Sequence, residues 1–213
     1  AGNRSISQPE VIEVKDVMVE RVEIASAQKA QYEQDGYTIL KGLFDPDECD
    51  RFIDHMMDLH EGREKIDGFQ FADAMSFALR NADDWSRVRN QHLFDPMAMA
   101  WMLDPRLRQP LCTCLDDEPE AISTMYFYKG SEQRRHQDAF HVPGCVSAWI
   151  ALQDVDERNG SIHIQPGSHR GPILDKKDLR EDADGVRGPW YGWDNEDAFD
   201  ALFERNGFPE IAV

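Results

Sequence analysis

The chain has 213 residues, of which 41% are hydrophobic, so it is long enough for one domain with a buried core. Its 41 Asp and Glu residues outnumber its 23 Lys and Arg residues, and the formal net charge of -18 disfavours binding to the phosphates of nucleic acid. The sequence shows no secretory signal and no apolar run long enough to span a bilayer. We therefore expect a cytoplasmic protein without nucleic-acid or membrane partners, and the oligomeric state stays open.

The four cysteines show no paired zinc spacing. Cys112 and Cys114 are two apart on a predicted helix, so their thiols point away from each other. We expect free, mostly buried thiols, as is usual for a protein of the cell interior.

The amino-terminal third of the chain alternates polar stretches with short structured segments. Residues 1–25 are polar with alternating Val and Ile, which predicts an N-terminal arm, and residues 26–213 form the single folded domain. Ser26 begins a short helix that runs to Gln34. The aromatic and β-branched residues of the stretch 37–41 predict a strand.

Three Asp-Pro steps predict helix starts, at Asp45, Asp95 and Asp104. Asp is a favourable N-cap, and proline fits the first helical position because its missing N–H needs no partner there. In the first of these helices Glu48 completes the capping pattern. Its buried stripe is predicted to be Cys49, Phe52, Ile53, Met56 and Leu59.

Residues 121–129 are predicted to form a strand, and the stretch after it contains the candidate metal-binding residues. His136 and Asp138 are two apart, so in an extended segment both side chains point to the same side and can give a nitrogen and a carboxylate oxygen to one metal ion. Chance alone could produce such a pair in a chain this rich in Asp, so the surrounding sequence has to show whether the pair binds a metal.

That pattern is a series of alternating segments and turns. Pro143-Gly144 is a turn signal, and residues 145–155 are apolar on both faces, which predicts a central strand. Asn159-Gly160 is a hairpin signal, and residues 161–165 alternate again as an antiparallel return strand. The motif Pro-Gly-Ser-His at 166–169 ends the unit.

Three motifs in order carry a resemblance: DGYTILKGLFDPDECDRF, MYFYKGSEQRRHQD and ALQDVDERNGSIHIQPGSHR. Over most of residues 30–170 the chain resembles the phytanoyl-CoA dioxygenase family of Fe(II)/2-oxoglutarate-dependent oxygenases. The resemblance implies a mainly β domain with flanking helices, a double-stranded β-helix (jelly roll, cupin-like). It also implies Fe(II) as the metal and 2-oxoglutarate as co-substrate.

The resemblance implies an activity as well. Such an enzyme hydroxylates, or otherwise oxidises, a small organic molecule and releases succinate and CO2. Relatives that halogenate carry a small residue at the carboxylate position, so the presence of Asp138 disfavours halogenation. The alternatives are a catalytically inactive jelly-roll binding domain, and a desaturase or cyclase with the same oxygenase chemistry.

Roles for individual residues follow from the resemblance. His136 and Asp138 are implied as iron ligands, which would be two of the three in a facial triad. Met125, Phe127 and Trp149 are implied along the wall of the 2-oxoglutarate pocket, although each could equally be an ordinary core residue.

Two more side chains are candidates for holding an iron ligand or the substrate, His169 and Arg134. Arg134 could also form a cationic cluster for an anionic substrate, and the alternative is scattered solvated charges. The other members of such a cluster would be Arg135, Arg158 and Arg170.

In the resembling enzymes the second His ligand and the arginine that binds 2-oxoglutarate lie on strands after the PGSH turn. His141, His163 and His169 are poor substitutes, since His141 would face the opposite side of the strand and His163 is typical of a half-exposed strand residue. We therefore expect the third ligand, a His, after residue 213. On this view the domain is C-terminally incomplete, because an unclosed jelly roll would leave an unpaired edge in water.

Two segments could cover the pocket. Residues 61–83 show little periodicity and predict either a substrate lid or a surface loop. Residues 172–194 contain Trp190, Tyr191 and Trp193 and could cover the entrance. A short helix is expected over 195–205, and residues 208–213 resemble a strand.

Overall fold

The computed structural model describes residues 26–67, 87–128, 135–174 and 196–213. Several predictions concern residues outside these ranges. They are the N-terminal arm, the greater part of the 61–83 segment, Arg134, and the aromatic group Trp190, Tyr191 and Trp193.

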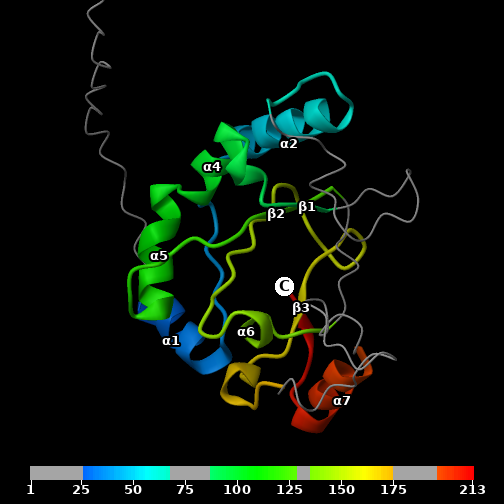
Figure 1. Cartoon of the computed structure of the whole chain (residues 1–213). Coiled ribbons are helices and arrows are strands. Elements are labelled where there is room, and N and C mark those ends of the chain that lie inside the picture. The colour runs from blue at the N-terminus through cyan, green and yellow to red at the C-terminus, as the bar shows by residue number, and fades with distance from the viewer. Residues whose placement is uncertain (1–25, 68–86, 129–134, 175–195) are drawn as a thin grey trace, which may run out of the picture.

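Helices make up most of the regular structure in the described ranges. They are α1 (Ser26–Asp35), α2 (Pro46–His60), α4 (Pro96–Met102), α5 (Pro105–Leu115), α6 (Asp138–His141) and α7 (Glu196–Asn206), with two 3-10 turns, η1 (Gln91–Leu93) and η2 (Ser168–Arg170). Strand β1 (Arg87–Arg89) pairs antiparallel with β2 (Met125–Phe127), and β3 (His163–Ile164) pairs antiparallel with β4 (Ile211–Ala212). In Figure 1, α2, α4 and α5 follow one another on one side, and α7 lies on the other, with α6 between α1 and α7.

The three Asp-Pro helix starts are confirmed. The Asp45 carboxylate accepts the N–H of Asp47 at 2.8 Å, and the Asp45 N–H donates to Glu48 Oε2 at 2.9 Å, which completes a capping box. Asp95 and Asp104 accept the N–H groups two residues further on, at 2.8 and 2.9 Å. Local capping chemistry therefore sets where α2, α4 and α5 begin.

Arg106 joins two of these helix starts. Its guanidinium donates to Glu48 Oε2 at 2.9 Å and to Asp104 Oδ2 at 2.7 Å, and it lies 4.4 Å from the Phe44 ring centroid. The hydrogen bond from Arg106, together with the one from the Asp45 backbone, lowers the pKa of Glu48 to about 2. The starts of α2 and α5 are thus held together by charge-assisted hydrogen bonds.

The main core lies between α2 and the β1–β2 ladder. Phe52, Met56 and Leu59 are buried as predicted and pack with Val88 of β1, and the partly buried Trp101 of α4 packs against them. In contrast to the main core, a second cluster is small and joins α6 to α7. In it the Phe140 and Phe199 rings meet edge to face at 5.5 Å.

The strand predicted over 37–41 is wrong. Its backbone turns back along α1 instead of joining a ladder, since the carbonyl of Ile39 accepts from Gln28 Nε2 at 3.0 Å and the Thr38 hydroxyl lies 3.4 Å from Gln31 Oε1. A side chain of α1 thereby takes one backbone hydrogen bond, at the Ile39 carbonyl, that a neighbouring strand would have made.

The central strand predicted over 145–155 is also wrong, because the structure places these residues in no ladder. The return segment does form a strand, β3, but its partner is β4, and the ladder extends with Val213 N–H donating to the Ile162 carbonyl at 2.9 Å. Trp149, in the segment expected to be covered on both faces, is 42% exposed.

The turns at 143–144 and 157–160 are both present. The helix at α7 and the strand near the carboxyl end are confirmed as well, and the double-stranded β-helix stays a prediction.

Gly36 gives a test of how the motif at 166–169 is placed. Its φ is +81°, and a Cβ atom there would lie 2.5 Å from His169 Nδ1. We expect Gly36→Ala to lower the free energy of unfolding by about 2–4 kcal/mol, since backbone strain and steric overlap add.

The matched control is Gly42→Ala, where φ is +69° and nothing lies within 4 Å. Strain alone predicts a loss of about 1 kcal/mol there. Urea unfolding of both variants measures the difference, and equal losses would show that His169 does not lie against Gly36.

Candidate metal centre

His136 and Asp138 lie side by side. The residue between them, Gln137, is extended, with φ −122° and ψ 117°, so its two neighbours project to the same side of the chain. His136 Nε2 is 3.3 Å from Asp138 Oδ1. The pairing predicted from the two-residue spacing is therefore present, although Asp138 itself begins the short helix α6 instead of continuing a strand.

A hydroxyl group orients the carboxylate. Ser147 Oγ donates to Asp138 Oδ2 at 2.6 Å, so each carboxylate oxygen has its own neighbour. The hydrogen bond from His136, together with the one from Ser147, lowers the pKa of Asp138 although burial opposes this. The ionised form, which a cation needs, is thereby favoured.

Side chains on the opposite side of the extended segment hold it in place. Gln137 Nε2 donates to the Pro172 carbonyl at 3.0 Å, and Gln137 Oε1 accepts the Leu174 N–H at 2.8 Å. Just before the pair, Arg135 binds Glu210 at 3.0 Å. Phe140, just after it, packs on α7. The alternation of the extended segment thus puts the side chains of Arg135 and Gln137 on one side and the candidate ligands on the other.

The two donors fit two positions of one metal ion. Ligand atoms about 2.1 Å from an ion and at roughly a right angle lie about 3.0 Å apart, close to the observed 3.3 Å. The side chains of His136 and Asp138 are 32% and 52% exposed, so a solute ion can reach them. Within the described ranges, no group of three His, Cys, Asp or Glu side chains is arranged to hold a metal.

Of the other histidines considered as ligands, His141 lies near enough to Asp138 to help lower the pKa of that carboxyl, whereas His163 and His169 contact other parts of the chain. His163 Nδ1 is 3.5 Å from Glu210 Oε1 on the β3–β4 ladder, and the His141 ring packs edge to face on Phe140 at 4.9 Å. His169 Nε2 is 3.2 Å from the Glu33 carbonyl. That none of the three supplies the third ligand stays a prediction.

The motif at 166–169 docks on the carboxyl end of α1. The N–H of Gly167 donates to the Asp35 carbonyl at 2.7 Å, and Arg170 donates to the carbonyls of Glu33 and Gln34. Carbonyls at a helix end lack partners within the helix and attract cations. This motif therefore caps α1, and a role for His169 near the metal or the substrate stays a prediction.

The side chains expected along the 2-oxoglutarate pocket lie on two segments. Met125 and Phe127 both belong to β2, and Met125 is 42% exposed whereas Phe127 is half-buried. Trp149 is likewise 42% exposed. Their assignment to the pocket stays a prediction.

The arginines considered for a cationic cluster have separate partners where the structure describes them. Arg135 binds Glu210, Arg158 binds Asp156, and Arg170 caps α1. No common anion site joins these three described side chains.

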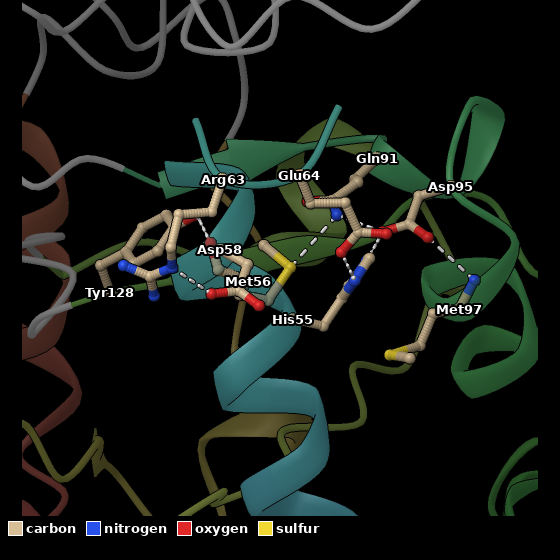
Figure 2. Close-up of polar contacts among 9 residues, drawn as sticks. All are labelled: His55, Met56, Asp58, Arg63, Glu64, Gln91, Asp95, Met97 and Tyr128. Atoms are coloured by element: carbon tan, nitrogen blue, oxygen red, sulfur yellow. Dashed lines mark hydrogen bonds and ion pairs between the residues drawn. The ribbon is translucent and has the colours of Figure 1, made fainter. Parts of the chain in front are cut away.

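A second polar cluster lies between α2 and the start of α4 (Figure 2) and was missed from the sequence. His55 Nδ1 is 2.9 Å from Glu64 Oε2, and His55 Nε2 is 2.8 Å from Asp95 Oδ2. Asp95 is buried, caps α4 through Met97, and also accepts from Gln91. Only an imidazolium can donate at both nitrogens. Burial lowers the pKa of His55, but the hydrogen bonds to Asp95 and Glu64 outweigh it and the net shift is upward.

Comparison with known proteins confirms the family resemblance that the sequence motifs carry. The model of the family described as phytanoyl-CoA dioxygenase (PhyH) matches residues 32–205. The chain belongs to the phytanoyl-CoA dioxygenase family. The match includes the three motifs, His136 and Asp138.

Curated relatives are distant. Phytanoyl-CoA dioxygenase domain-containing protein 1 of Danio rerio is 23% identical over 189 residues, which is 67% of this chain and 65% of the relative. Phytanoyl-CoA dioxygenase 1 of Oryza sativa subsp. japonica is 28% identical over 101 residues, 44% of this chain and 36% of the relative. The peroxisomal phytanoyl-CoA dioxygenase of Rattus norvegicus is 23% identical over 166 residues, 68% of this chain and 48% of the relative. The matched region is thus less than two thirds of each relative.

Of the helices that the structure describes, none combines the length and the apolar composition needed to cross a bilayer. The name of the rat relative places that protein in the peroxisome. A cytoplasmic location for this chain stays a prediction.

The His55 cluster predicts a pH dependence of stability. Because the pKa of His55 is raised in the fold above its ordinary 6.5, its contribution is complete below about pH 6.5 and is lost as the pH rises through the raised value. We expect the free energy of unfolding to fall over this window, and to fall less in His55→Gln.

Urea unfolding between about pH 6 and about pH 9 measures this slope. The control is His163→Gln, which changes a half-exposed histidine on β3 and should keep the slope of the parent protein. Equal slopes in the parent and His55→Gln would contradict the cluster.

Proposed function

We propose that the chain is a non-haem Fe(II)- and 2-oxoglutarate-dependent dioxygenase. It hydroxylates, or otherwise oxidises, a small organic molecule and releases succinate and CO2. The observation that carries the proposal is the 3.3 Å approach of His136 Nε2 and Asp138 Oδ1 in a chain of the phytanoyl-CoA dioxygenase family. Paired imidazole and carboxylate donors are what a non-haem Fe(II) oxygenase needs.

The chain's own residues have distinct tasks at the centre. When bound, Fe(II) supplies the activation of dioxygen with 2-oxoglutarate as the source of electrons. His136 offers a ring nitrogen and Asp138 a carboxylate oxygen. Ser147 holds the other carboxylate oxygen and so fixes the rotation of that group. Gln137 holds the backbone between the two donors.

The proposed fold around this centre is the double-stranded β-helix of the family. Support comes from the two antiparallel ladders, since a jelly roll is built from antiparallel strands. The ladder between β3 and β4 brings residues about 50 positions apart into register, His163 with Ala212. Long-range pairing of this kind is characteristic of such barrels.

A binding domain without catalysis is the second candidate. In the described part of the chain no third donor joins His136 and Asp138, and 3.3 Å also suits a hydrogen bond from an imidazole to a carboxylate. On this reading the pair is structural. A desaturase or cyclase would share the centre and differ only in the mass of its product.

Anaerobic titration separates the Fe(II) oxygenase from the binding domain without catalysis. We expect the protein with Fe(II) and 2-oxoglutarate to develop a weak visible charge-transfer band, and Asp138→Asn to lose it and to bind Fe(II) at least about tenfold more weakly, because the carboxylate supplies both a ligand and the compensating charge.

The matched control is Asp54→Asn, which removes an exposed carboxylate on α2 and should keep both the band and the affinity. A parent protein that binds Fe(II) no better than Asp138→Asn, and develops no band, would support the non-catalytic domain instead.

A further inference from the structure

The His55 ring on α2 lies between two carboxylates from different parts of the chain (Figure 2). Glu64 belongs to the segment 61–67 that follows α2, and its Oε2 is 2.9 Å from His55 Nδ1. Asp95 precedes α4, and its Oδ2 is 2.8 Å from His55 Nε2. One imidazolium therefore ties α2 to both neighbouring segments.

The two carboxylates differ in burial and in their other partners. The Asp95 side chain is 1% exposed, and besides His55 it accepts from Gln91 Nε2 and from the Met97 N–H. The Glu64 side chain is 49% exposed. A buried carboxylate depends on its protein donors, whereas an exposed one can replace a lost donor with water. Losing the His55 proton is therefore much more costly at Asp95 than at Glu64.

Other contacts hold the segment 61–67 more loosely or more locally. The N–H groups of Arg63 and Glu64 donate to the Asp58 carbonyl at 2.8 and 3.1 Å, and Ile66 packs against the main core. The Asp58 side chain is paired with Arg63, whose Nε lies 2.6 Å from Asp58 Oδ1. Among the described residues, the charged groups that face His55 are thus Glu64 and Asp95.

The geometry decides which ring nitrogen loses its proton. A neutral imidazole has one donor nitrogen and one acceptor nitrogen. With the proton on Nδ1, the lone pair of Nε2 would face the buried Asp95 carboxylate in a site closed to solvent. With the proton on Nε2, the lone pair of Nδ1 faces Glu64, which can turn into water. The neutral form with the proton on Nε2 is therefore favoured.

We propose that His55 is a pH-dependent switch that releases Glu64 and keeps Asp95. As the pH rises, the proton on Nδ1 passes to water, and Glu64 separates from the ring. The bond from Nε2 to Asp95 holds α2 and α4 together, while the segment 61–67 loosens. Because the pKa of His55 is raised, the change occurs above the ordinary value of 6.5. The switch involves no metal and does not depend on the proposed oxygenase function.

Nitrogen NMR of protein that carries isotope-labelled histidine tests which ring nitrogen is protonated. The signals of His55 are identified by their loss in His55→Gln. Between about pH 6 and about pH 9 we expect a change from two protonated ring nitrogens to one, with the remaining proton on Nε2. A proton on Nδ1 at the upper end, or no change across this range, would overturn the proposal.

Hydrogen exchange over the same range tests whether the segment loosens. After correction for the intrinsic pH dependence of exchange, we expect the protection of the Glu64 amide to fall about threefold as His55 loses its proton. The Met97 amide, which donates to Asp95 at 2.8 Å, should keep its protection. An equal fall at both amides, or constant protection of Glu64, would contradict a selective release.

Variants locate the effect. Glu64→Gln removes the charge and offers an amide that can donate to the bare Nδ1. It should lower the midpoint of the His55 transition by about one pH unit and abolish the loss of protection at residue 64. The matched control is Glu61→Gln, since Glu61 lies in the same turn but pairs with Arg63, and it should leave both unchanged. An unchanged midpoint in Glu64→Gln, or the same shift in Glu61→Gln, would overturn the proposal.

Discussion

The extended backbone at Gln137 is the constraint on which the candidate centre depends. One residue in this conformation turns its neighbours, His136 and Asp138, to the same side, and it turns its own side chain to the other. The hydrogen bonds of Gln137 to the 172–174 segment then hold that conformation. A helical residue at this position would separate the imidazole from the carboxylate, so the chemistry of the pair rests on one backbone geometry.

Local signals predicted the helices because their causes are local. The Asp-Pro steps place a cap and a preorganised first residue within two positions, and α2, α4 and α5 begin as expected. Amino-acid composition predicted the strands less well, since a strand needs a pairing partner and the sequence of the segment does not determine which other segment that is. Residues 37–41 bond to side chains of α1, and β3 pairs with β4 about 50 residues later instead of with the preceding segment.

At the candidate centre, too, the sequence predicted what depends on local geometry and missed what depends on long-range contacts. The two-residue spacing of His136 and Asp138 predicted their approach because it needs only local backbone geometry. The long-range contacts that support the pair had no local signal. Ser147 was expected on a central strand, and its bond to Asp138 exists because the chain turns at 143–144 and returns. Arg135 was considered for substrate binding but anchors the chain to Glu210.

The central claim is that His136 and Asp138 bind one metal ion together. Crystals grown with Mn(II) in place of Fe(II) and measured for anomalous scattering test it most directly, because the position of the ion is then seen without any assay of activity. The account predicts an anomalous peak bound by both the His136 ring nitrogen and an Asp138 carboxylate oxygen. A peak elsewhere, with these two side chains bonded only to each other, would contradict it.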